Sequence, residues 1–321
     1  MESAAEAARR AAAGAEAAPV RSLQAVDRSW PRRSAGSVLR DYVTLTKPRI
    51  ISLLLLTTVA AMFVADPSGP ALSTLLWTVI GGYLAAGGAG AINHYLERDA
   101  DARMARTRGR PLASGRIDPI HGLVFGIALG TLAVLELGLA VNVLAAVLAL
   151  VGLLGYTLLY TLWLKPLTPQ NIVIGGAAGA VPPLVGWAAA TGGLDVDALY
   201  LFGIVFLWTP PHFWALALLI KDDYARTGVP MLPVVRGEAT TRGQILLYSI
   251  LLVTMTLLPV AGGLLGLPYL VAALVLGAAF VGLAATLRAR PSRRAALRLY
   301  LASLAYLALL FVFMALDRAV W

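Results

Sequence analysis

Long apolar runs separated by short polar segments divide most of the chain. Each run approaches the roughly 20 residues that an α-helix needs to cross a bilayer. The runs lie near residues 50–66, 71–96, 118–138, 141–164, 171–191, 196–220, 244–264, 267–288 and 298–317. The pattern predicts an all-α, polytopic membrane protein whose nine transmembrane helices are embedded in a lipid bilayer.

The chain before the first apolar run has a different character. It is rich in Ala, Arg and Ser and contains no sustained hydrophobic stretch. It is somewhat like an organelle transit peptide, but its several acidic residues argue against that interpretation, because transit peptides are poor in Asp and Glu. We therefore predict a mobile cytoplasmic tail over residues 1–46 and a nine-helix domain over residues 47–321.

Composition and charge placement agree with a membrane protein. The chain is 59% hydrophobic and 13% charged, whereas soluble proteins are about half apolar and a quarter charged. When nine spans are drawn, all of the 26 Lys and Arg residues except Arg318 fall on the side of the N-terminus. The positive-inside rule then places the N-terminus in the cytoplasm and the C-terminus outside the cell (inner) membrane. The net charge of +9 thus reflects topology, and nucleic-acid binding is not expected. The absence of cysteine excludes thiolate chemistry.

A first acidic motif follows the second apolar run, in the stretch NHYLERDADARMARTRGRPL. Asn93, Glu97 and Asp101 are spaced four residues apart, so on a helix they share one face. A hard divalent cation would relieve the repulsion between the carboxylates, and such oxygen donors suit Mg²⁺ that bridges to phosphate. Arg106 and Arg110 follow closely, and guanidinium groups bind phosphate bidentately. The motif predicts a metal–diphosphate site; the alternative is a solvated loop with incidental ion pairs.

A second acidic motif follows the sixth run. Asp222 and Asp223 come directly after an apolar helix on the same predicted membrane face as the first motif. Two such helix ends could converge on one metal and diphosphate. The alternative is a helix end whose aspartates pair with neighbouring basic residues.

Polar residues within the spans are further candidates. Tyr156 and Tyr160 lie one turn apart near the cytoplasmic face, with Lys165 beyond them. The tyrosines are either interfacial anchors or rings that stabilise a carbocation. His212 follows two prolines expected to interrupt the sixth span, and a polar residue at that depth is either a functional group or an interhelical hydrogen-bond partner.

These stretches resemble a known family, the intramembrane prenyltransferases of the 4-hydroxybenzoate type, and within it the protoheme IX farnesyltransferases (heme O synthases). The resemblance runs from LTKPRI to the C-terminus, and PPHFWAL and GVPMLPVVRG are typical of the heme branch. It implies that the first motif binds metal and diphosphate and that Asp222 and Asp223 form the second metal motif. Diphosphate contacts would come from Arg106, Arg110 and Lys165. Two departures from the family pattern are Glu97, where Asp is common, and the missing Asp-x-x-x-Asp spacing of the second motif.

The resemblance also implies a reaction. The farnesyl group of farnesyl diphosphate would be joined to a vinyl group of heme b with addition of water, giving heme O and diphosphate. Mg²⁺ would be the cofactor and heme b a substrate, within a central chamber open to the cytoplasmic face. Tyr156, Tyr160 and His212 would contact substrate, and a heme A synthase would be a possible partner.

Two other functions fit part of the pattern. A prenyltransferase of the same fold could act on an aromatic quinone precursor, although the heme-branch stretches argue against it. A transporter with broken helices would place ionisable residues at the membrane centre, whereas here the acidic residues gather at helix ends on one face.

The charge partition leads to a topology prediction. Because it requires an odd number of spans, a reporter fused to the C-terminus should be active only outside the cytoplasm. A reporter at the N-terminus serves as the opposite control. Activity of the C-terminal reporter in the cytoplasm would contradict the nine-span topology.

Overall fold

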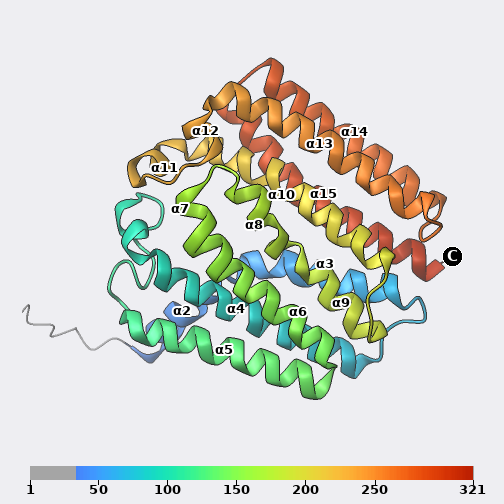
Figure 1. Cartoon of the computed structure of the whole chain (residues 1–321), viewed down its shortest axis with the longest axis horizontal. Helices are drawn as coiled ribbons and strands as arrows, with labels where there is room; N and C mark the ends of the chain where they lie inside the picture. The colour runs from blue at the N-terminus through green and yellow to red at the C-terminus, as the bar shows by residue number, and fades with distance from the viewer. Residues whose placement is uncertain (1–33, 321) are drawn as a thin grey trace, which may run out of the picture. The chain divides into compact units, whose positions relative to one another are not determined.

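The computed structural model describes residues 34–320 (Figure 1). Leu39–Trp321 group into one compact unit, and the description below concerns that unit. The described residues form α2 (Ala35–Thr46), α3 (Pro48–Ala65), α4 (Leu72–Arg103), α5 (Pro119–Ala140), α6 (Val143–Leu154), η1 (Gly155–Leu164), α7 (Lys165–Leu167), α8 (Asn171–Gly179), α9 (Val181–Thr191), α10 (Val196–Leu219), α11 (Lys221–Thr227), α12 (Leu232–Val235), α13 (Gly237–Ala261), α14 (Leu267–Ala289) and α15 (Arg293–Val320). Of these, η1 is a π-helix.

The predicted nine-span, all-α architecture is confirmed. Within residues 34–320, nine helical segments are long and apolar enough to cross a membrane, and no strand occurs there. Two spans are composite: one joins α6, η1 and α7, and the other joins α8 and α9. The helical ends differ from the predicted ends by a few residues, most at the end of α4, which extends to Arg103, and at the start of α13, which begins at Gly237.

The predicted tail of residues 1–46 lies outside the described residues up to residue 33. Its last part forms α2, a helix that the sequence analysis did not expect. Asp41 on α2 is buried and accepts hydrogen bonds from Arg116 in the loop before α5, with Nε 3.2 Å from both carboxylate oxygens. An amphipathic helix thus precedes the first span.

The prolines of the fifth and sixth spans behave differently. A single residue, Ala180, separates α8 from α9, so the fifth span is interrupted just before Pro182 and Pro183. The expected interruption of the sixth span is wrong, because α10 continues through Pro210 and Pro211, both of which are buried. Packing against neighbouring helices lets a membrane helix tolerate the hydrogen bonds that proline removes.

Close packing of small residues joins α4 to α5. A Cβ added to Gly88 of α4 would lie 2.7 Å from the carbonyl oxygen of Gly126 and 2.8 Å from the backbone nitrogen of Gly130, both on α5. The two backbones can approach this closely only because these positions carry no side chain. The other half of the unit is built from α10, α13, α14 and α15, which pack against one another, and α15 also contacts α3.

Two residues at the end of α15 form hydrogen bonds with the start of α14 and with the end of α3. The Asp317 carboxylate accepts hydrogen bonds from the backbone nitrogens of Gly266, at 2.6 Å, and Tyr269, at 3.0 Å. These donors lie at the beginning of α14, where backbone N–H groups have no partner within the helix. Arg318 Nε donates to the carbonyl oxygen of Val64 at the end of α3, at 3.2 Å.

The role of Asp317 can be tested by substitution. Asp317→Ala removes both acceptors from the start of α14 and should lower the free energy of unfolding by about 1 kcal/mol, as for other helix caps. Asp317→Asn, which keeps one acceptor oxygen, should lose less. Tryptophan fluorescence during thermal unfolding in detergent would measure both. An unchanged midpoint for Asp317→Ala would show that the cap contributes nothing.

Candidate functional site

The C-terminal end of α4 carries the three predicted oxygen donors on one face, as the spacing requires. Each of them meets a basic side chain. Asn93 Oδ1 accepts a hydrogen bond from Lys47 Nζ at 2.5 Å. Asp101 Oδ2 accepts one from Arg110 at 2.6 Å, and Glu97 is paired with Lys165. We call these six residues the paired cluster.

The partners of α4 come from three different segments. Lys47 precedes α3, Arg110 lies in the loop between α4 and α5, and Lys165 begins α7. Asn93 and Asp101 are almost fully buried, so the charges and dipoles must be satisfied within the protein. The structure thereby brings Arg110 and Lys165 to the first motif, as the sequence analysis expected.

Lys47 is a site residue that the sequence analysis missed. Its backbone adopts a left-handed conformation, with φ 58°, immediately before α3. Burial, together with the nearby Arg110 and Lys165, lowers the pKa of Lys47 to about 7, although Glu97 and Asp101 act in the opposite direction. The available signal was a lysine directly before the proline that starts the first apolar run.

The π-helix η1 presents the two predicted tyrosines to this cluster. Their rings are stacked with centroids 5.7 Å apart and an interplanar angle of 22°. Lys47 Nζ lies 5.8 Å from the ring centroid of Tyr156, and Lys165 Nζ lies 6.0 Å from that of Tyr160. Both rings therefore contact cations of the site, which supports the second of the two roles considered for them.

Two further contacts position η1. Thr161 Oγ1 accepts a hydrogen bond from Asn93 Nδ2 at 3.0 Å and donates one to the Tyr156 carbonyl oxygen at 2.8 Å. Gly175 of α8 lies against Tyr160, so that a Cβ at this position would overlap the ring. The widened turn of a π-helix, which is frequent at functional sites, is thus held between α4 and α8.

The second acidic motif lies on α11, which contacts α4. Asp223 is buried and paired with Arg226, whereas Asp222 is exposed and makes no hydrogen bond or ion pair with any described residue. Both aspartates border a cavity of about 480 Å³ that Arg106 also borders. The structure thus places Arg106 with the second motif rather than in the paired cluster. The residues around this cavity are Ala105, Arg106, Leu219, Ile220, Asp222, Asp223, Arg226 and Arg293.

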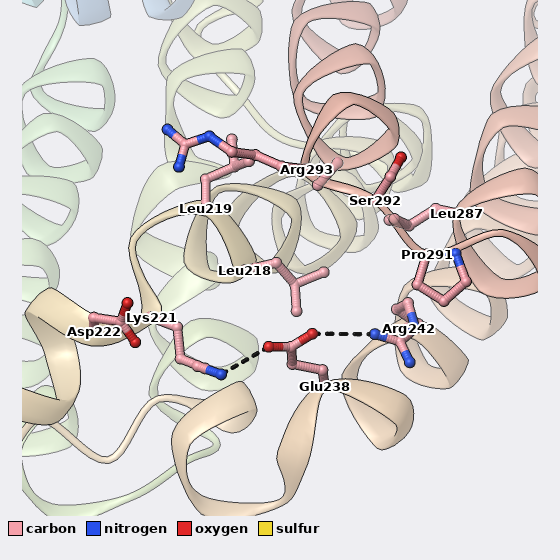
Figure 2. Close-up of a pocket in the computed structure, with 11 residues that line it drawn as sticks. Leu218, Leu219, Lys221, Asp222, Glu238, Arg242, Leu287, Pro291, Ser292 and Arg293 are labelled. Carbon is pink, nitrogen blue, oxygen red and sulfur yellow. Dashed lines mark hydrogen bonds and ion pairs between the residues drawn. The ribbon is translucent and has the colours of Figure 1, made fainter.

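Asp222 also borders a second cavity, of about 310 Å³, at the ends of α10, α13 and α14 (Figure 2). Figure 2 shows Glu238 between Lys221 and Arg242, with Glu238 Oε1 2.7 Å from Lys221 Nζ and Oε2 3.3 Å from Arg242. This ion-pair chain occupies one wall of the cavity. Asp222 is therefore the acidic residue of the second motif that remains accessible.

The donors of the first motif match a hard divalent cation in chemistry. Asn93, Glu97 and Asp101 offer only oxygen atoms, which is the ligand type that Mg²⁺ prefers. Across residues 34–320, however, no three His, Cys, Asp or Glu side chains gather into a group that could hold a metal. The oxygen donors instead face Lys47, Lys165 and Arg110. The arrangement can bind a polyanion, with the basic groups, together with a cation, with the oxygens.

His212 lies apart from the paired cluster, and its contacts are with aromatic residues and a serine. Its Nδ1 is 2.7 Å from Ser303 Oγ on α15. Its ring stacks on Trp208 and Tyr300, with centroid distances of 4.3 and 4.9 Å. The interhelical hydrogen bond considered for this residue is thus present. Ser303 and Tyr300 were not identified from the sequence.

Comparison with known proteins identifies the family and several relatives of this chain. Residues 54–315 match the UbiA prenyltransferase family. A protoheme IX farnesyltransferase of Symbiobacterium thermophilum is 55% identical over 288 residues, covering 89% of this chain and 96% of that protein. One of Roseiflexus sp. (strain RS-1) is 54% identical over 285 residues, covering 89% of this chain. The chain spans about half the length of that relative and of several others, 53% in this case.

A solved structure shares the fold. A UbiA homolog from Archaeoglobus fulgidus, bound to DMAPP and Mg²⁺, superimposes with a TM-score of 0.59 at 14% sequence identity. The match covers 85% of this chain and 99% of that one. At this identity the likeness concerns the fold alone.

The paired cluster leads to a binding prediction. Addition of Mg²⁺ and inorganic pyrophosphate should raise the thermal unfolding midpoint of the purified protein, because ligands that bind the folded state stabilise it. Arg110→Met and Lys165→Met should each reduce this increase. The increase is the quantity to compare, because either substitution also leaves a buried carboxylate unpaired and lowers the midpoint itself.

Arg103→Met is the matched control for this measurement. Arg103 is exposed at the end of α4, and its substitution by Met removes the same positive charge as Arg110→Met. If Arg103→Met reduced the pyrophosphate effect as much as Arg110→Met, the binding would reflect general charge and not the paired cluster.

Proposed function

Because the chain belongs to the UbiA prenyltransferase family, we propose that it transfers the farnesyl group of farnesyl diphosphate to a vinyl group of heme b. Water is added in the same reaction, and the products are heme O and diphosphate. The observation that carries the proposal is the match to a protoheme IX farnesyltransferase along almost its whole length, at 55% identity. The paired cluster at the end of α4 supplies a suitable place for a diphosphate.

The basic residues of the site would bind the diphosphate. Lys47, Arg110 and Lys165 already converge on one helix face, and guanidinium and ammonium groups stabilise negative charge that develops on a leaving group. Arg106 lies at the neighbouring cavity, from which it would contact the outer phosphate. Binding would release the basic groups from Asn93, Glu97 and Asp101.

The oxygen donors freed in this way would hold Mg²⁺, with Asp222 as the accessible acidic residue of the second motif. When bound, Mg²⁺ neutralises charge on the departing diphosphate. The exchange would keep every charge compensated. The basic side chains would leave the carboxylates and bind phosphate, and the carboxylates would then bind the metal. A UbiA homolog of the same fold is bound to DMAPP and Mg²⁺, which supports a prenyl diphosphate and Mg²⁺ as ligands.

Tyr156 and Tyr160 would stabilise the allylic cation that forms when the carbon–oxygen bond to diphosphate breaks. Their stacked rings already lie within about 6 Å of two ammonium groups, so their faces point into the site. The terminal vinyl carbon of heme b then bonds to farnesyl C1. The new cation, next to the porphyrin, takes up water and releases one proton, which balances the reaction.

The membrane placement completes the proposal. By the positive-inside rule, the paired cluster would lie on the cytoplasmic side of the cell (inner) membrane, with the N-terminus inside and the C-terminus outside. A chamber open to that face would admit farnesyl diphosphate from the cytoplasm and keep water from the cation. The product would be consumed by a heme A synthase, which would be a partner. The structure describes a multi-pass membrane protein with suitable spans.

The site assignment can be tested by removing one carboxylate of the first motif at a time. Asp101→Ala and Glu97→Ala should each lower heme O formation by about 10²–10³-fold, as for other groups that stabilise transition-state charge. Mass spectrometry of hemes after incubation of the purified protein with heme b, farnesyl diphosphate and Mg²⁺ would measure this. Asp99→Ala is the matched control, because Asp99 lies on the same helix with its side chain 83% exposed. Near-normal activity of Asp101→Ala would show that the motif is structural.

Substrate and metal can be tested in the same assay. The wild-type protein should prenylate heme b and not 4-hydroxybenzoate, and EDTA should abolish activity until Mg²⁺ is restored. Prenylation of 4-hydroxybenzoate alone would favour the quinone-precursor alternative. Absence of any prenylated product would contradict the proposed function itself.

A further inference from the structure

His212 has a fixed orientation deep within the sixth span. It lies on α10 and is 7% exposed. Trp208 stacks on its ring with an interplanar angle of 18°, and Tyr300 does so with an angle of 28°. Trp208 Nε1 in turn donates to the backbone oxygen of Ser303 at 2.8 Å. The imidazole is thus held by α10 and α15 together and can neither rotate nor flip freely.

The hydrogen bonds of Ser303 determine the tautomer of His212. Ser303 Oγ donates its single proton to the Tyr300 carbonyl oxygen at 2.6 Å. It can therefore only accept from His212 Nδ1, which lies 2.7 Å away. Nδ1 must carry the proton, and the lone pair of the neutral imidazole is then on Nε2. For a solvent-exposed histidine, in contrast, the hydrogen bonds would not determine which ring nitrogen carries the proton.

Nε2 of His212 has no hydrogen-bond partner in the part of the chain that the structure describes. No donor or acceptor among residues 34–320 forms a hydrogen bond with it. Nevertheless, it is not one of the polar atoms that are both unpaired and fully enclosed by protein. It therefore retains accessible surface, although the residue as a whole is buried. A lone pair that is oriented from the opposite side of its ring, and left open, has the features of a metal ligand.

We propose that Nε2 of His212 binds the iron of the heme substrate as an axial ligand while the vinyl group reacts. The proposal rests on the proposed function, since heme is the substrate there. Histidines that bind iron commonly donate their other ring N–H to an oxygen, which fixes the ring and makes the ligand more basic. Ser303 and the Tyr300 carbonyl oxygen provide such an oxygen and its support.

Ligation would explain how a symmetric, mostly apolar macrocycle is positioned. Iron lies at the centre of the porphyrin, so one bond fixes the distance of the ring from α10. The stacked Trp208 and Tyr300 then restrict its tilt. His212 would be a substrate-binding residue in this arrangement, and Ser303 a positioning residue that acts through it.

Titration of the purified full-length protein with ferric heme tests the proposal. The absorption and electron paramagnetic resonance spectra of the wild-type complex should show nitrogen ligation. His212→Ala should lose this signature and bind ferric heme at least about tenfold more weakly, and added imidazole should restore the spectrum. Ser303→Ala should keep the ligand but weaken heme binding by about tenfold, the lower end of the effect of removing the oxygen that supports a histidine ligand.

Two controls separate ligation from packing. Iron-free protoporphyrin IX should bind wild type and His212→Ala equally, because no iron bond is lost; equal weakening of heme and protoporphyrin would show that His212 only packs. His121→Ala removes another imidazole, from the exposed start of α5, and should leave the heme spectrum unchanged.

The outcomes also distinguish this proposal from the proposed function. If wild type forms heme O but His212→Ala has the wild-type heme spectrum, axial ligation is overturned and the farnesyl transfer stands. If wild type neither binds heme nor forms heme O, the proposed function fails. Loss of nitrogen ligation in His212→Ala, with rescue by imidazole, supports both.

Discussion

Compensation of buried charge at the C-terminal end of α4 is the constraint on which the rest of the site depends. Two carboxylates and one amide face a region with little water, where an unpaired charge is strongly unfavourable. Lys47, Arg110 and Lys165 supply the compensation from three separate segments. The start of α3, the loop after α4 and the end of the fourth span are therefore all drawn to one helix. The electrostatic requirement of the site is also what assembles it.

Such pairs contribute specificity more than stability, because desolvation cancels much of the attraction between the partners. That balance suits a site whose partners must change. A polyanion and a cation entering together could take over each half of every pair without leaving a charge uncompensated. The stacked tyrosines of η1, held by the hydrogen bond of Thr161 to Asn93 and by the close contact of Tyr160 with Gly175, lie beside these pairs. Charge and aromatic surface thus meet at one place, as the breaking of an allylic diphosphate requires.

The second polar centre follows a different rule. His212 is surrounded by aromatic rings, and within residues 34–320 its one hydrogen-bond partner is Ser303. One side of the imidazole is used for packing between α10 and α15, and the other is left open. The two centres differ in chemistry: charged groups are paired at the end of α4, whereas a neutral imidazole lies among aromatic rings on α10.

Local properties of the sequence determined the spans and the oxygen-bearing face of α4. Hydropathy over about 20 residues decides whether a segment enters a membrane, and helical periodicity decides which side chains share a face. Asn93, Glu97 and Asp101 could therefore be grouped correctly without coordinates. Arg110 was identified because it closely follows the motif and guanidinium groups bind phosphate, and Lys165 because the motif resembles that of a family.

Only the tertiary structure decided which residues meet. Lys47 lies 46 residues before Asn93, and Ser303 lies 91 residues after His212, so no local pattern indicates either contact. The continuity of α10 through Pro210 and Pro211, the widened turn of η1 and the helix α2 likewise depend on neighbouring helices. Packing can satisfy or displace a backbone group in ways that intrinsic propensity does not record. The types of side chain in the site could be predicted from the sequence, whereas the partner that each of them contacts depends on the fold.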